Sequence, residues 1–213
     1  MTHPSIHAKT SPDKIAYRMA GSGQALTYRE LDERSNRGAQ LFRSLGLKAG
    51  DHVALLMENR LDFMEICWAA QRSGLYYTAI SRYLTQDEIA YIVKDCGARV
   101  VITSEKCADV VAPLITNTVE PMFYIVDGSR PGFRDWNTTL AAQPATPIAD
   151  EVAGYDMLYS SGTTGRPKGI KRASENNPID VPNPFLKLLC ANMCGMTSDS
   201  IYLSPAPLYH AAP

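Results

Sequence analysis

Apolar residues recur with two different spacings along this chain. Segments in which apolar residues follow one another directly alternate with segments in which they return every three or four positions. The first pattern is typical of strands covered on both faces, and the second is typical of helices with one buried side. The expected strands are residues 52–57, 76–80, 99–103 and 122–126, and the expected helices are residues 27–45, 60–73, 85–96 and 105–114. Repeated βαβ units of this kind predict a layered α/β fold, with a parallel-rich sheet and flanking helices.

Capping residues indicate where three of these helices begin. Thr27 and Thr85 are each followed three positions later by a glutamate, Glu30 and Glu88, which is the capping-box pattern. Asn59 precedes the expected helix at residues 60–73, and we expect its side chain to cap that helix.

Residues 128–152 lack a clear period and are rich in Pro, Gly, Asp and Thr. Apart from a short helix expected at residues 136–142, this stretch is interpreted as a surface connection. It would separate a first α/β subdomain, at about residues 10–127, from a second region at residues 153–213.

Composition and charge exclude several classes of protein. The 213 residues are 45% hydrophobic, which is enough for a folded core. The 21 basic and 22 acidic residues leave a net charge of −1, so the charge balance does not favour binding to nucleic acid or to an anionic membrane.

No apolar run approaches the roughly 20 residues that span a bilayer, so no transmembrane segment is expected. The N-terminal residues lack the pattern of a signal peptide, and we expect a cytoplasmic protein. The oligomeric state stays open.

A nicotinamide enzyme is also disfavoured. The βαβ pattern alone would suit a dinucleotide-binding fold, but no G-x-G-x-x-G follows the first strand. Gly21-Ser22-Gly23 precedes a helix start without the third glycine.

The cysteines are Cys67, Cys96, Cys107, Cys190 and Cys194. Their odd number and scattered spacing fit neither a disulfide framework nor a zinc ribbon, so we expect reduced thiols. Cys190 and Cys194 lie one helical turn apart, which would allow a shared metal, but only His210 is near in sequence. Two buried small residues are the favoured interpretation.

The stretch at residues 159–170, Y-S-S-G-T-T-G-R-P-K-G-I, has the chemistry of a phosphate-binding loop. Its glycines let backbone N–H groups turn inward, its hydroxyls add neutral donors, and Lys168 supplies a positive charge. Runs rich in Ser, Gly and Thr are more often flexible surface loops. Here strand-like residues on both sides, 157–159 and 169–170, indicate a loop that is held at both ends. The Walker A pattern does not fit, because Gly169 follows Lys168 where Ser or Thr is required.

Two motifs resemble those of a known family. Y-S-S-G-T-T-G-R-P-K-G at residues 159–169 resembles the signature loop of the adenylate-forming enzymes, which include acyl-CoA synthetases, aryl ligases, luciferases and peptide-synthetase adenylation domains. L-S-P-A-P-L-Y-H-A-A at residues 203–212 is similar to the P-L-Y-H-x-A segment that lines the acyl pocket of that family. Weaker similarity extends the resemblance over about residues 10–213.

The resemblance implies a role for each motif residue. The residues that would line the β- and γ-phosphates of ATP are Ser160, Ser161, Gly162, Thr163, Thr164, Gly165 and Lys168. Tyr209 and His210 would lie at the carboxylate end of the acyl pocket, where His210 would orient the substrate. A carboxylic acid is already ionised at neutral pH, so His210 is interpreted as a positioning group more than a base. Lys168 and His210 are the candidate catalytic residues, and the residues that would contact Mg²⁺ stay open.

The family reaction has two steps. A carboxylate attacks the α-phosphate of ATP with Mg²⁺ to give an acyl-adenylate and pyrophosphate, and a thiol, usually coenzyme A, then displaces AMP. Family members are more than twice as long as this chain. The resemblance therefore implies a partial N-terminal domain of an adenylate-forming ligase, without the C-terminal domain and its catalytic lysine. The complete protein would be an acid-thiol ligase, and this chain alone would be inactive.

Residues 171–177 depart from the family pattern. Lys171 and Arg172 are either a solvated charge pair or, if they flank the loop, a pair that attracts the phosphates of ATP or coenzyme A. Residues 185–193 are interpreted as a helical lid or packing element over the site.

The resemblance favours a medium- or long-chain fatty acid, or another apolar carboxylic acid, as the substrate. An aryl-acid ligase and an adenylation domain that loads a carrier protein remain as alternatives. From another class, the chain would be a non-catalytic binding or assembly module.

Overall fold

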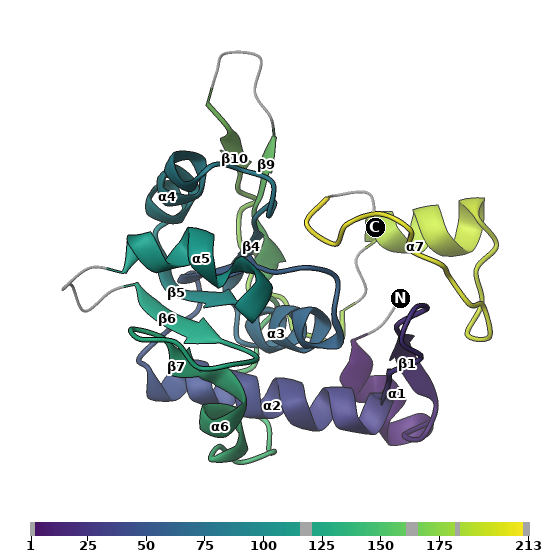
Figure 1. Ribbon diagram of the computed structural model, residues 1–213. Helices are drawn as coiled ribbons and strands as arrows, with labels where there is room; N and C mark the ends of the chain where they lie inside the picture. The colour runs from purple at the N-terminus through teal and green to yellow at the C-terminus, as the bar shows by residue number, and fades with distance from the viewer. Residues whose placement is uncertain (1–2, 116–120, 161–165, 182–183, 211–213) are drawn as a thin grey trace.

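The computed structural model describes residues 3–115, 121–160, 166–181 and 184–210 (Figure 1). The strands are β1 (Ile15–Arg18), β2 (Ala25–Thr27), β3 (His52–Leu56), β4 (Tyr76–Ala79), β5 (Ala98–Thr103), β6 (Met122–Ile125), β7 (Arg134–Asp135), β8 (Tyr155–Asp156), β9 (Leu158–Ser160) and β10 (Lys168–Ile170). Within these residues, one parallel sheet of six strands has the order β7-β6-β5-β3-β4-β8. Two antiparallel pairs, β1 with β2 and β9 with β10, lie outside that sheet.

Most of the helices lie between these strands in the chain. The α-helices are α1 (Pro4–Thr10), α2 (Tyr28–Ser44), α3 (Leu61–Arg72), α4 (Gln86–Asp95), α5 (Ala108–Val111), α6 (Trp136–Ala141) and α7 (Pro184–Lys187). Of these, α1 precedes β1 and α7 follows β10. Shorter 3₁₀ turns at Glu105–Cys107 and Ala112–Leu114 flank α5, and a π-helical stretch, Leu188–Met193, follows α7. The single helix expected at residues 105–114 is therefore segmented. Pro113 lies in the last segment and has no N–H for an α-helical hydrogen bond.

Helices cover both faces of the sheet (Figure 1). Successive side chains of β3 point to opposite faces, as a strand requires. Val53 and Leu55 belong to a buried cluster with residues of α2, α3 and α6, whereas Ala54 and Leu56 belong to a second cluster with residues of α4 and α5. The layered α/β architecture with a parallel sheet is as predicted.

Both predicted capping boxes form. Thr27 Oγ1 accepts a hydrogen bond from the Glu30 N–H at 3.2 Å, and the Thr27 N–H donates to Glu30 Oε2 at 2.8 Å. The same reciprocal pair joins Thr85 and Glu88 at the start of α4.

The cap predicted for α3 is wrong. Arg60 occupies the N-cap position of α3, and it makes no side-chain capping hydrogen bond. The Asn59 side chain instead bonds to backbone atoms of Ala206 and Leu208, almost 150 positions away in the chain. A distant segment thus competes successfully with the helix N-terminus for this amide.

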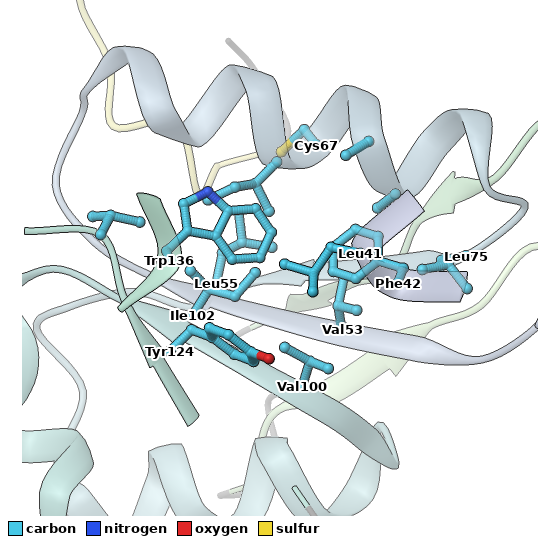
Figure 2. Packing of buried hydrophobic residues seen from close by; sticks show 14 of the residues in the cluster. Leu41, Phe42, Val53, Leu55, Cys67, Leu75, Val100, Ile102, Tyr124 and Trp136 are labelled. Atoms are coloured by element: carbon cyan, nitrogen blue, oxygen red, sulfur yellow. The ribbon is translucent and has the colours of Figure 1, made fainter. Parts of the chain in front are cut away.

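Part of the expected surface connection lies inside the core. Trp136, the first residue of α6, is fully buried, and its ring centroid lies 5.9 Å from that of Phe42 and 5.7 Å from that of Tyr124 (Figure 2). Its indole N–H donates to Glu65 Oε1 at 3.3 Å. Two residues of α6, Trp136 and Leu140, therefore complete the hydrophobic layer that α2 and α3 cover.

The segment after β10 leaves many apolar side chains exposed, unlike the residues that form the sheet and its covering helices. Large apolar side chains on its surface are Val181, Leu186, Leu188, Leu189, Met193, Ile201, Tyr202 and Leu203. Cys190 is half-buried and Cys194 is exposed, so the expectation of two buried cysteines is wrong. The reason is that the helical turns at 184–193 pack mainly on one another instead of on the sheet. They also lie apart from the β9–β10 hairpin in Figure 1, so they do not cover it as a lid.

Two kinds of site are not found in the described part of the chain. No group of three or more His, Cys, Asp or Glu side chains there is placed to hold a metal ion. None of the helices described has the length and apolar character needed to cross a membrane.

Candidate functional site

The predicted phosphate loop joins the two strands of an antiparallel hairpin. Lys168 lies opposite Ser160, and Gly169 lies opposite Tyr159, in the β9–β10 register. At the loop end of the hairpin the Ser160 hydroxyl donates to the Lys168 carbonyl oxygen at 3.5 Å, and both residues are exposed. The other predicted loop residues, Ser161, Gly162, Thr163, Thr164 and Gly165, lie outside the described residues. The strand pairing agrees with a loop that is held at both ends.

Helix α4 contacts the hairpin on both sides of the loop. On the strand that enters the loop, the Tyr159 hydroxyl donates to Asp95 Oδ2 at 2.5 Å. After the loop, the Arg166 guanidinium lies 5.3 Å from the centre of the Tyr91 ring, a cation–π contact. Tyr91 and Asp95 are four residues apart and share one face of the helix. One helix face therefore holds both ends of the loop.

Gly169 makes room for the Tyr159 side chain. A Cβ atom at residue 169 would lie 2.5 Å from Met157 Cε and 2.9 Å from the Tyr159 ring, closer than real Cβ contacts occur. Glycine therefore lets the Tyr159 ring lie across β10 and reach Asp95. Burial, followed by the hydrogen bond to Asp95, raises the pKa of Tyr159 well above its usual value, so its hydroxyl stays protonated as the donor.

Replacement of Tyr159 by phenylalanine should loosen the hairpin without unfolding the sheet. The variant loses one hydrogen bond to a carboxylate, so the amides of β9 and β10 should exchange hydrogen about 5- to 20-fold faster. Hydrogen exchange read by mass spectrometry over residues 155–170 measures this. Tyr202→Phe, at an exposed tyrosine, is the matched control. Equal exchange in both variants would contradict a role for Tyr159 in holding the loop.

The second motif lies at the carboxyl end of β3. The Asn59 amide donates to the Ala206 carbonyl at 3.1 Å, and Asn59 Oδ1 accepts from the Leu208 N–H at 2.9 Å. Leu208 and Tyr209 are partly buried against the core, whereas His210 is exposed. The rings of Tyr209 and His210 have centroids 4.5 Å apart.

A cavity of about 290 Å³ opens beside this second motif. The residues that line it are Met57, Glu58, Asn59, Arg82, Tyr83, Pro205, Pro207 and Tyr209. They come from the segments that follow β3 and β4 and from residues 205–209. The cavity therefore lies at the carboxyl edge of the sheet, which is where open α/β sheets bind ligands.

Both motifs lie at the same edge of the sheet. β8 pairs in parallel with β4, and the chain runs on from β8 into β9, so the hairpin projects beyond the carboxyl end of β4. Residues 206–208 attach just beyond the carboxyl end of β3, the neighbouring strand. The structure brings Ser160 together with Lys168, and Tyr209 together with His210.

Lys171 and Arg172 lie at the opposite edge. Lys171 Nζ is 2.9 Å from His52 Nε2 and 4.4 Å from the centre of the Tyr76 ring, and the Tyr76 hydroxyl donates to the Arg172 carbonyl at 2.5 Å. His52 and Tyr76 are the first residues of β3 and β4. Lys171 is therefore neither a freely solvated charge nor a flank of the phosphate loop, because it is used at the amino ends of the strands.

Acid should destabilise the fold partly through His52. Burial, and then the charge of Lys171, lowers the pKa of His52 to about 4. Between pH 6.5 and about 4 the unfolded chain binds a proton at this residue and the folded chain does not, so stability falls as the pH falls. His52→Gln, which keeps a hydrogen-bond acceptor, should remove about 2–3 kcal/mol of that pH dependence. Urea unfolding at several pH values in this range measures it. If the free energy of unfolding of His52→Gln depended on pH as steeply as that of the unaltered protein, the attribution to His52 would be wrong.

Sequence reasoning missed three residues that position the motifs. The spacing of Tyr91 and Asp95 could have shown that they share one face of a helix. Nothing in the sequence indicates what that face contacts. Asn59 was noticed only as a helix cap. Its contacts to residues 206 and 208 depend on the tertiary fold, so local patterns do not reveal them.

Comparisons with known proteins agree with these observations. The family model described as "AMP-binding enzyme" matches residues 5–213. The chain is 30% identical over 203 residues to a crotonobetaine/carnitine–CoA ligase of Proteus mirabilis, covering 89% of this chain and 38% of that protein. It is also 30% identical over 212 residues to the long-chain-fatty-acid–CoA ligase FadD13 of Mycobacterium tuberculosis, covering 96% of this chain and 40% of that protein. The chain thus spans about two fifths of the length of the curated relatives it matches.

A solved structure supports the same assignment. The inhibitor-bound N-terminal domain of FACL13 from Mycobacterium tuberculosis superposes with a TM-score of 0.74 at 26% identity, covering 99% of this chain and 52% of that one. The predicted resemblance and the predicted fold class are both confirmed. On its fold, its two motifs and these comparisons, the chain belongs to the family of AMP-binding enzymes.

Proposed function

We propose that the protein containing this chain activates a carboxylic acid with ATP and transfers the acyl group from the adenylate to coenzyme A. The observation that supports this most is the β9–β10 hairpin, in which Ser160 and Lys168 pair at the base of a glycine- and hydroxyl-rich loop at the carboxyl edge of the sheet. A loop of neutral donors with one ammonium suits the β- and γ-phosphates. Positioned donors of this kind catalyse nucleotidyl transfer by stabilising the charge that develops on pyrophosphate.

The proposed roles of the other loop residues rest on their resemblance to the family motif, and those of Tyr209 and His210 rest also on where they lie. Ser161, Gly162, Thr163, Thr164 and Gly165 would complete the phosphate loop, and Mg²⁺ would enter with ATP, because it needs few protein ligands and keeps several waters. Tyr209 lines the cavity beside β3, so it and His210 are proposed to orient the substrate carboxylate. We place the protein in the cytoplasm, as its scattered cysteines suggest, and we take the present chain as the N-terminal part of the large domain.

The acid is proposed to be a fatty acid, with an aryl acid as the alternative. The names of the two relatives differ in the acid, since one names crotonobetaine or carnitine and the other a long-chain fatty acid. The test is ATP–pyrophosphate exchange by the complete protein with fatty, aryl and amino acids, run beside the 213-residue chain alone. Exchange by the complete protein with one acid class would support the ligase and name its substrate. No exchange with any acid would overturn the proposal and favour a non-catalytic binding module.

A further inference from the structure

We infer that Asn59 is a positioning residue for Tyr209 and His210, acting by fixing the backbone of residues 206–208. This inference rests on the proposed function, because it names a residue through which the acid-binding side of that site is held. Asn59 itself follows β3 and is far from residues 206–208 in sequence, yet both ends of its amide bond to them.

The backbone around Asn59 is held on both sides. Before it, Glu58 Oε2 accepts from the Ser104 hydroxyl at 2.6 Å. After it, Arg60 donates to Asp127 Oδ2 at 2.7 Å and to Asp62 Oδ2 at 2.7 Å. Ser104 and Asp127 lie just after β5 and β6, and Asp62 lies in α3. The Asn59 side chain is thus presented from a fixed point at the carboxyl edge of the sheet.

The segment that Asn59 holds is stiff. Pro205 and Pro207 fix two backbone φ angles, and each proline also restricts the residue before it. Because prolines have no N–H, the Leu208 N–H is the first donor after Pro207, and Asn59 takes it. The Ala206 carbonyl, between the two prolines, is the other point of attachment. Two attachments on a stiff segment fix both its position and its direction.

This placement is passed on to the two aromatic side chains. The His210 N–H donates to the Pro207 carbonyl at 3.1 Å, which closes a turn directly after the segment that Asn59 holds. Tyr209 lies inside that turn and lines the cavity of about 290 Å³, and its ring lies tilted against that of His210, with the centroids 4.5 Å apart. A shift of Ala206 or Leu208 would therefore move Tyr209 relative to the cavity.

Fixing residues 206–208 requires both the donor and the acceptor of the Asn59 side-chain amide. Asn59→Asp has the same shape and keeps an acceptor for the Leu208 N–H, but its second oxygen faces the Ala206 carbonyl and repels it. Asn59→Ala removes both bonds. Asn177→Ala is the matched control, because the Asn177 side chain bonds locally to Glu175 at 2.8 Å.

The test combines two readouts on the complete protein. Hydrogen exchange of a peptide covering residues 204–210 should become about 5- to 20-fold faster in both Asn59 variants and should not change in Asn177→Ala. In ATP–pyrophosphate exchange, kcat/KM for the preferred acid should fall about tenfold in both Asn59 variants, while the KM for ATP changes less than about twofold. A merely destabilised protein would lose active enzyme and would not separate the acid from ATP.

Each outcome decides a separate point. Unchanged hydrogen exchange in the Asn59 variants would show that the attachment is absent and would overturn the inference. Faster hydrogen exchange with unchanged kinetics for the acid would overturn the positioning role. If the unaltered protein gives no pyrophosphate exchange, the proposed function fails, and the positioning role fails with it, whereas the attachment of residues 206–208 is still decided by hydrogen exchange.

Discussion

Replacement of Lys168 by alanine should reduce ATP–pyrophosphate exchange by the complete protein about 100- to 1000-fold, the range found when one preorganised donor to developing charge is removed. Lys168 begins β10 and lies opposite Ser160, so its ammonium is carried by a paired strand. Its backbone bonds persist in the variant, and its side chain is exposed, so folding should not change.

Two further variants make this experiment specific. Lys168→Arg keeps the charge but changes its shape, and it should retain more activity than alanine does. Lys187→Ala removes an exposed lysine from α7, outside the hairpin, and should leave exchange unaltered. Thermal unfolding of all three proteins checks the fold. Full exchange in a folded Lys168→Ala protein would mean that this loop does not act on the phosphates.

Replacement of Trp136 by alanine should lower the free energy of unfolding by about 3–5 kcal/mol, as for other large side chains removed from cores. The indole is fully buried between Phe42 and Tyr124 (Figure 2), and its removal would also leave Glu65 without one of its donors. Burial already raises the pKa of Glu65, so a lost donor makes the charged carboxylate less favourable still.

Urea unfolding of the 213-residue chain would measure this loss. Trp136→Phe should cost less than alanine, because it keeps an aromatic ring and loses mainly the bond to Glu65. Tyr83→Ala, at a tyrosine that is 69% exposed, should change stability by only about 0.5 kcal/mol. A loss of similar size in Tyr83→Ala and Trp136→Ala would contradict the view that α6 completes the core.

The elements that could be predicted from the sequence are those whose signals are local. β3 is an unbroken apolar run, and α2 and α4 begin at capping boxes, so each was placed within about two residues. The β1–β2 pair was missed because its strands are short and only partly buried, and β7 and β8 were missed because two residues carry no period. The burial of Trp136 was missed for another reason. A single tryptophan in a polar stretch does not form the periodic apolar pattern that would identify the buried side of a helix.

In the candidate site, too, the features with local sequence signals were predicted, and those that depend on the tertiary fold were not. The loop chemistry around Lys168 and the aromatic pair at Tyr209 were predicted because motif residues are contiguous in sequence. The contacts that hold them were not, because Asp95 and Asn59 meet the motifs only after β4 and β3 have paired in the sheet. Neither interpretation of Lys171, as a solvated charge or as a flank of the loop, matches its place, because closeness in sequence to the loop does not indicate at which edge of the sheet the chain arrives.

The two outermost strands of the parallel sheet, β7 and β8, contain only two residues each. An outer strand of that length offers few unpaired N–H and C=O groups to a strand of another molecule. Pairing of the sheets of two molecules through these outer strands, which leads to fibrous aggregates, is therefore disfavoured at both β7 and β8. Association of this chain with itself should instead involve the apolar side chains exposed between residues 181 and 203, and it should be suppressed by mild detergent.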